Sequence, residues 1–158
     1  MALMPNPPAL SFSEAVADRV QSLLAPPVTS NTLNSALRHL AKWRSELVAN
    51  TVLARSGAVV QSGPFKGMAY PVRASEGSRN ARLVGCYEAS LHPVIEKIVN
   101  GGYKLVIDIG SAEGYYATGL ALRMPKARVL ARDTDPKARE ACALMAEANG
   151  LTERVEIG

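Results

Sequence analysis

The sequence predicts an α/β fold built on a parallel sheet. From residue 83 on, short apolar runs alternate with amphipathic helical segments, the first apolar run is rich in β-branched residues, and a glycine-rich turn follows it directly. Strands that alternate with helices are typical of βαβ units, whose crossovers make the strands parallel. The 158 residues suffice for one domain of ordinary size, and 47% hydrophobic against 20% charged residues indicate a globular chain.

Composition and charge exclude several classes of protein. The net charge of +4 is small for a dedicated nucleic-acid binder, and the basic excess lies in residues 1–82, outside the motifs described below, so we predict no nucleic-acid partner. Two cysteines and two histidines without metal-ligand spacing predict neither a metal site nor a disulfide framework. No apolar run reaches the roughly 18–20 residues of a membrane span, and the N-terminus lacks the pattern of a signal peptide. We therefore expect a soluble, cytoplasmic protein.

The first half of the chain is predicted to form a helical cap and a β-hairpin over residues 11–82, after a disordered, proline-rich head at residues 1–10. Capping-box spacing and helical periodicity mark the start of the first helix, and a Pro-Pro pair ends it. Two short apolar runs around a Gly-Pro turn predict the hairpin. The expected segments are a helix over 11–25, a helix over 30–56, a hairpin over 57–72 and a polar loop over 73–82.

The second half, residues 83–158, is predicted to alternate helix and strand. The run Leu105–Ile109 is apolar almost throughout, so we expect a strand that is buried on both faces. Pro136 in the first turn and Gly150 just past the end mark the last helix. The expected helices cover residues 91–99, 115–123 and 136–149, and the expected strands cover residues 105–109, 128–131 and 154–157.

Two turns should meet at the carboxyl edge of this sheet, where parallel α/β sheets bind ligands. The first turn, residues 108–114, has glycines that permit a close backbone approach, and the helix after it offers free N–H groups. The second turn begins at Asp133, 19 residues after Gly114. This is close to the spacing of roughly 20 residues that places a carboxylate on ribose hydroxyls. The two turns together predict a site for an adenosine-containing cofactor.

The residues of the first turn favour S-adenosylmethionine over a dinucleotide. A dinucleotide fingerprint that starts at Gly110 would need glycines where this chain has Ala112 and Tyr115. Glu113 would also place negative charge beside a pyrophosphate. S-adenosylmethionine has no phosphate, and its ammonium and sulfonium groups are compatible with Asp108 and Glu113.

The stretch Val106–Ala117 resembles motif I of the class I S-adenosylmethionine-dependent methyltransferases, in the variant of the FkbM-like members. Asp133–Pro136 is similar to the acidic position after the second strand of that family, and Asn149–Val155 to its approach to the third strand. The resemblance covers residues 83–158. It implies a Rossmann-like fold, of which this chain would hold the first three strands, and transfer of a methyl group from S-adenosylmethionine.

The resemblance also implies roles for individual residues. Asp108 would lie near the amino end of the cofactor, Asp133 would accept its ribose hydroxyls, and Thr134 would lie beside the adenine. The wall around the methionine part would be formed by Gly110, Ser111, Ala112 and Gly114. Glu113 and Tyr115 are further cofactor-binding candidates; Glu113 could instead favour a helix N-terminus, and Tyr115 could serve packing. Arg132 departs from the family, which often has an apolar residue there; it either lowers the pKa of Asp133 or points to solvent.

Several points stay open at the level of sequence. Methyl transfer depends mainly on the alignment of donor and acceptor, and we identify neither the acceptor, small molecule or macromolecule, nor the general base that an oxygen acceptor needs. The family has seven strands, so we expect a truncated protein that binds the cofactor weakly and self-associates through its edge strand. The alternative functions are an NAD(P)-dependent oxidoreductase and a non-catalytic module that binds an adenosyl cofactor.

Overall fold

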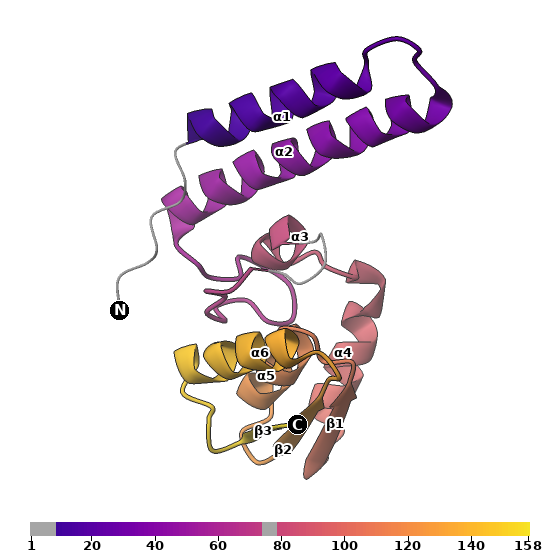
Figure 1. Ribbon diagram of the computed structural model, residues 1–158. Helices are drawn as coiled ribbons and strands as arrows, with labels where there is room; N and C mark the ends of the chain where they lie inside the picture. The colour runs from indigo at the N-terminus through magenta and orange to yellow at the C-terminus, as the bar shows by residue number, and fades with distance from the viewer. Residues whose placement is uncertain (1–8, 74–78) are drawn as a thin grey trace. The chain divides into compact units, whose positions relative to one another are not determined.

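The computed structural model describes residues 9–73 and 79–158 (Figure 1). The chain separates into two compact units, Met1–Asn50 and Thr51–Gly158, so the predicted division after residue 82 lies inside the second unit. Most of the predicted head, residues 1–8, lies outside the described part of the chain. No helix in the described ranges is long and apolar enough to cross a membrane. Within the same ranges, no group of three or more His, Cys, Asp or Glu residues could hold a metal ion.

The first unit contains two helices, α1 (Ala9–Leu23) and most of α2 (Ser30–Ser56). Helix α1 begins two residues before its predicted start, whereas α2 has the predicted bounds. The indole N–H of Trp43 donates a hydrogen bond to the Ser13 hydroxyl at 3.0 Å and so joins the two helices.

The predicted β-hairpin is not formed as a strand pair, because residues 57–73 fold into a tight loop with a single antiparallel bridge between Val59 and Ala69. Successive turns occupy the middle of this loop; in one of them the Met68 N–H donates to the Phe65 carbonyl at 3.0 Å. These turns use residues that would have to pair with each other for the bridge to extend into a two-stranded hairpin.

The predicted loop over residues 73–82 is also partly wrong. Residues 74–78 lie outside the described part of the chain, but Arg79–Val84 forms a short helix, α3, which buries Arg82 and Leu83. Gly85 ends this helix with a φ of +85°. A side chain at that position would collide with the carbonyl of Ser62, so the glycine lets the loop and the end of α3 approach closely.

The rest of the second unit is an α/β domain with a parallel sheet, as predicted, and its topology is Rossmann-like. The strand order is β1-β2-β3, and Val106, Val129 and Val155 lie side by side in register. The elements are a 3₁₀ turn η1 (Ala89–Leu91), α4 (His92–Asn100), β1 (Leu105–Ile109), α5 (Tyr115–Arg123), β2 (Arg128–Arg132), α6 (Pro136–Ala148) and β3 (Val155–Ile157).

The core of this domain lies on one face of the sheet. Helices α5 and α6 pack against each other and against the strands on that face, where Val129, Ala131 and Cys142 are fully buried (Figure 1). The prediction that β1 is buried on both faces is wrong. Every second residue of β1 faces the other side, and Ile107 and Ile109 there are 57% and 84% exposed. Both helices cover the same face, and no described element covers the opposite one.

Candidate functional site

A cavity of about 390 Å³ lies at the carboxyl edge of the sheet. It is lined by Ile109, Gly110, Arg132, Asp133, Thr134 and Gly158, which end or follow the three strands. Gly110, Asp133 and Thr134 are among the residues that the sequence places at a cofactor site. The parallel topology therefore brings the two predicted turns to one cavity.

Hydrogen bonds connect the two turns directly. The Ala112 N–H donates to Oδ2 of Asp133 at 2.9 Å, and the Gly110 N–H donates to the Arg132 carbonyl at 2.8 Å. Ala112 has a φ of +47°, a left-handed conformation that residues other than glycine seldom adopt. The carboxylate of Asp133 thus holds the backbone of the first turn in an unusual conformation.

Asp133 is kept ionised by its surroundings. The N–H groups of Asp135 and Ala112, and more weakly the guanidinium of Arg139, hold the pKa of Asp133 below its ordinary value. Arg132 has a different partner, since its Nη2 lies 2.7 Å from a carboxylate oxygen of Glu156. Arg132 therefore neither lowers the pKa of Asp133 nor points freely into solvent, which were the two alternatives from the sequence. A carboxylate has about four acceptor positions, so Asp133 can accept further hydrogen bonds from a ligand.

Asp108 has one oxygen without a partner. Its side chain is half-buried near the end of β1, and Oδ2 makes no hydrogen bond with any described residue. Burial raises the pKa of Asp108, the charge of Asp133 raises it further, and the Ala117 N–H opposes the rise. The hydroxyls of Ser111 and Thr118 are likewise buried without a partner. Buried polar atoms are normally satisfied, so these three atoms suit a polar ligand or ordered water near the start of α5.

Glu113 points away from the cavity into the protein. Its carboxylate is fully buried, lies 2.8 Å from Nε of Arg82 and accepts a hydrogen bond from the Tyr70 hydroxyl at 2.9 Å. Burial, together with the nearby Glu113 charge, raises the pKa of Tyr70, so this phenol stays protonated and can donate. The ion pair joins the first turn of the site to α3, and the hydrogen bond from Tyr70 joins it to the loop over residues 57–73.

Tyr115 also lies outside the cavity lining. It is 4% exposed and belongs to an aromatic cluster with edge-to-face contacts. Its ring neighbours are Phe65, Tyr70, Tyr87 and Tyr116, at centroid distances of 5.3–6.1 Å. Glu113, in a buried ion pair, and Tyr115, in an aromatic cluster, are therefore both absent from the cavity wall.

Gly114 allows α5 to pack closely against α6. It has a φ of +83°, and a Cβ at this position would lie 2.5 Å from Sγ of Cys142 on α6. The close approach explains why the turn requires glycine here whether or not a ligand binds.

The sequence did not identify Arg82 and Tyr70 as neighbours of the site. A buried glutamate requires a partner. The position of Glu113 shortly after a predicted buried strand was therefore the only signal of this pairing in the sequence. It does not say which of the chain's eighteen basic residues pairs with Glu113.

No protein-family model matches this sequence, and a search of curated proteins gave no match. Solved structures that are similar in part include two methyltransferases. One is the N,N-8-amino-8-demethyl-D-riboflavin dimethyltransferase RosA from Streptomyces davawensis, with 14% identity over 93% of this chain and a TM-score of 0.38. The other is an O-methyltransferase family protein from Burkholderia thailandensis, with 19% identity over 78% of this chain and a TM-score of 0.35. The chain spans 36% of the length of each. Likeness at this level carries no argument about function.

Proposed function

We propose that this chain binds S-adenosylmethionine and belongs to a methyltransferase, of the FkbM-like type that its motif I resembles. The observation that carries the proposal is the cavity at which the two turns meet, with the ionised Asp133 on its wall. The unpartnered oxygen of Asp108 lies near the end of the neighbouring strand. These features suit a ligand with hydroxyl donors at one end and a cation at the other.

Asp133 would bind the ribose of the cofactor. Its two oxygens already accept the N–H groups of Ala112 and Asp135, and a carboxylate with about four acceptor positions has room for a ribose hydroxyl as well. Because the pKa of Asp133 is lowered, the carboxylate is ionised at neutral pH and makes strong, charge-assisted hydrogen bonds.

Asp108 would bind the ammonium group of the cofactor. A cation beside Oδ2 would supply the missing partner and reverse the rise in the pKa of Asp108 that burial causes. The backbone between Gly110 and Gly114 would enclose the methionine part, and the buried hydroxyl of Ser111 would face a polar group there.

The cofactor supplies an electrophilic methyl group, and the chain's own residues position it. Orientation of donor and acceptor accounts for a large part of the acceleration in such transfers. An oxygen acceptor would also need a general base, and Asp133 and Asp108 are assigned to the cofactor here. The acceptor, small molecule or macromolecule, is therefore left open in this proposal.

Calorimetric titration with S-adenosylmethionine, S-adenosylhomocysteine, NAD(H) and NADP(H) tests the proposal. We expect the two adenosyl ligands to bind and Asp133→Ala to weaken them by about 1.5–3 kcal/mol, the value of hydrogen bonds to a charged group. Glu147→Ala, which removes an exposed carboxylate of α6, is the matched control and should bind like the wild type.

Two results would overturn the proposal. Tighter binding of a dinucleotide than of either adenosyl ligand would favour an oxidoreductase. Absence of adenosyl binding by the folded wild-type chain would refute the cofactor assignment. Cofactor binding without methyl transfer to any acceptor would instead favour a non-catalytic module.

A further inference from the structure

One side of helix α6 contacts both turns of the site. Near the start of this helix, Nη1 of Arg139 donates a hydrogen bond to the backbone carbonyl of Asp133 at 2.6 Å. Cys142 follows three positions later and so lies on the same side of the helix. Its thiol lies against the first turn and leaves no room for a Cβ at Gly114. The helix therefore reaches the first turn through a small buried side chain and the second turn through a charged one.

Arg139 completes the set of contacts that restrain Asp133. The side-chain oxygens accept the N–H groups of Ala112 and Asp135, and the backbone N–H donates to the Gly158 carbonyl at 3.1 Å. The guanidinium of Arg139 binds the backbone carbonyl. Among these partners it alone is a side chain, and it alone carries a charge. Its removal would therefore release the backbone at Asp133 and take a positive charge away from the carboxylate.

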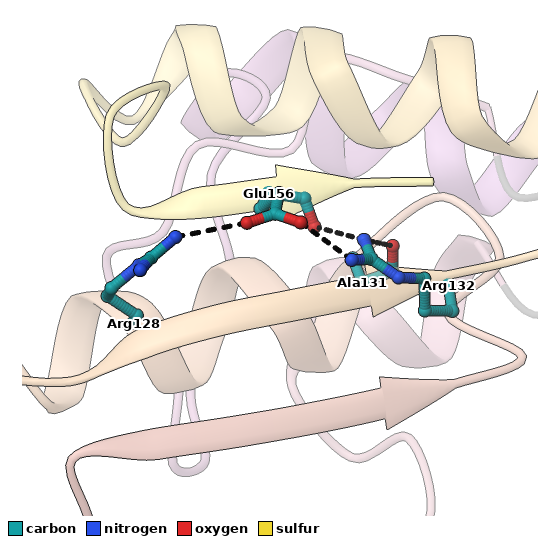
Figure 2. A network of polar contacts seen from close by, with 4 residues as sticks. All are labelled: Arg128, Ala131, Arg132 and Glu156. Atoms are coloured by element: carbon teal, nitrogen blue, oxygen red, sulfur yellow. Dashed lines mark hydrogen bonds and ion pairs between the residues drawn. The ribbon is translucent and has the colours of Figure 1, made fainter.

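Other titratable groups near Asp133 do not replace this charge. Arg132, its neighbour on β2, pairs with Glu156, with 2.7 Å between Nη2 and Oε1, as Figure 2 shows. Burial raises the pKa of Asp108 on β1 and of Cys142 on α6, and the Asp133 charge raises both further, so neither group supplies positive charge. The guanidinium on α6 is the cation that helps the backbone N–H groups hold the pKa of Asp133 below its ordinary value.

We propose that Arg139 is a positioning residue, which holds the Asp133 carboxylate in place for the ribose hydroxyls of the cofactor. This inference rests on the proposed function. Arg139 does not belong to the lining of the cavity, so it acts through Asp133 and not on the ligand itself. A carboxylate that is fixed before binding loses little conformational freedom when the ligand arrives. A carboxylate that stays ionised also makes the stronger, charge-assisted hydrogen bonds.

Titration of the full chain with S-adenosylhomocysteine tests this role. Arg139→Met keeps the apolar stem of the side chain and removes both the donor and the charge. At pH 7 it should weaken the ligand by about 3- to 10-fold, the size of one hydrogen bond. Arg139→Lys keeps a charged donor and should recover most of this affinity. Lys137→Ala is the matched control, because it removes an exposed cation of the same helix that does not line the cavity, and it should bind like the wild type.

A second measurement needs no ligand and separates positioning from a general loss of structure. The NMR signal of the Asp133 carboxyl carbon in the free protein follows the ionisation of this group. The Arg139 charge adds to the backbone N–H groups in lowering the pKa of Asp133, so Arg139→Met should raise that pKa. Asp133 should then protonate at a higher pH than in the wild type, whereas Arg139→Lys should titrate like the wild type. Where Arg139→Met does not fold, Arg139→Gln, which also lacks the charge, should show the same rise.

The proposal is overturned if Arg139→Met binds S-adenosylhomocysteine within about twofold of the wild type, a difference below one hydrogen bond. It is also overturned if the affinity falls while Asp133 titrates unchanged and Arg139→Lys restores nothing, since Arg139 would then only stabilise the fold.

The same measurements separate this inference from the proposed function. If the wild type binds S-adenosylhomocysteine and Asp133→Ala weakens it while the Arg139 variants do not, only the positioning role fails. If the folded wild type binds no adenosyl ligand, the proposed function itself fails, and the NMR titration still measures the effect of Arg139 on Asp133.

Discussion

Two carboxylates, Asp108 before the turn after β1 and Glu113 at its end, have different surroundings. Glu113 faces the preceding loop and helix, where Arg82 and Tyr70 satisfy it. Asp108 is half-buried near the end of β1 and has an oxygen that no described residue satisfies. Glu113 is fully buried, and Asp108 is half-buried.

The difference shows which side of the turn serves the fold and which is available to a ligand. An unpaired buried charge costs folding free energy, so a fold under no other demand would pair it or replace it. The Glu113 side follows that rule, and the Asp108 side violates it. Violations of this kind are expected at functional sites.

Glu113→Ala should cause the largest loss of stability, about 3–5 kcal/mol, because it leaves the buried Arg82 without its carboxylate. Urea unfolding followed by circular dichroism measures this loss. The exposed Glu153→Ala is the control and should stay within about 0.5 kcal/mol of the wild type. A loss below about 1 kcal/mol for Glu113→Ala would contradict a structural role for this ion pair.

Gly114→Ala should destabilise the chain by about 1–3 kcal/mol, since a Cβ there meets Cys142 and the residue has a positive φ. Denaturant unfolding again gives the value. Adding Cys142→Ala should restore only part of the stability, because the smaller residue relieves the collision but not the strain of the backbone. Full restoration would show that the positive φ of Gly114 is unimportant.

Asp108→Asn should stabilise the free protein slightly, by less than about 1 kcal/mol, and weaken S-adenosylmethionine. The folded pKa of Asp108 is raised above its ordinary 3.8, so wild-type stability falls as the pH rises from 3.8 through the folded pKa. The advantage of the variant should therefore be absent below pH 3.8 and complete at pH 7. Thermal melts at both pH values measure this, and a variant less stable than the wild type at pH 7 would contradict the prediction.

The arrangement of residues 83–158 could be predicted from the sequence because it depends on local signals. The β-branched run of β1, the glycines of the first turn and Pro136 at the start of α6 each mark an element boundary where it occurs. Parallel topology then places Gly110 and Asp133 at one edge of the sheet without further information.

The contacts outside that frame depend on pairs that are distant in sequence. Arg82 and Glu113 are 31 positions apart, and Tyr70 is 43 positions from Glu113. No periodicity connects such residues. The uncovered face of β1 could not be predicted either, because the apolar run Leu105–Ile109 has the composition of a doubly covered strand whether or not helices cover both sides.

The hydrogen bond from Ala112 to Asp133 makes the backbone of one turn sensitive to the charge of the other. Protonation of Asp133, or its replacement, weakens the acceptor that holds Ala112 in the left-handed region. The amide of Ala112 is consequently a built-in reporter: its NMR signal should follow the titration of a side chain 21 positions along the chain. Any group that binds the Asp133 carboxylate, whether a proton or a sugar hydroxyl, should therefore also alter the backbone of the turn over residues 108–114.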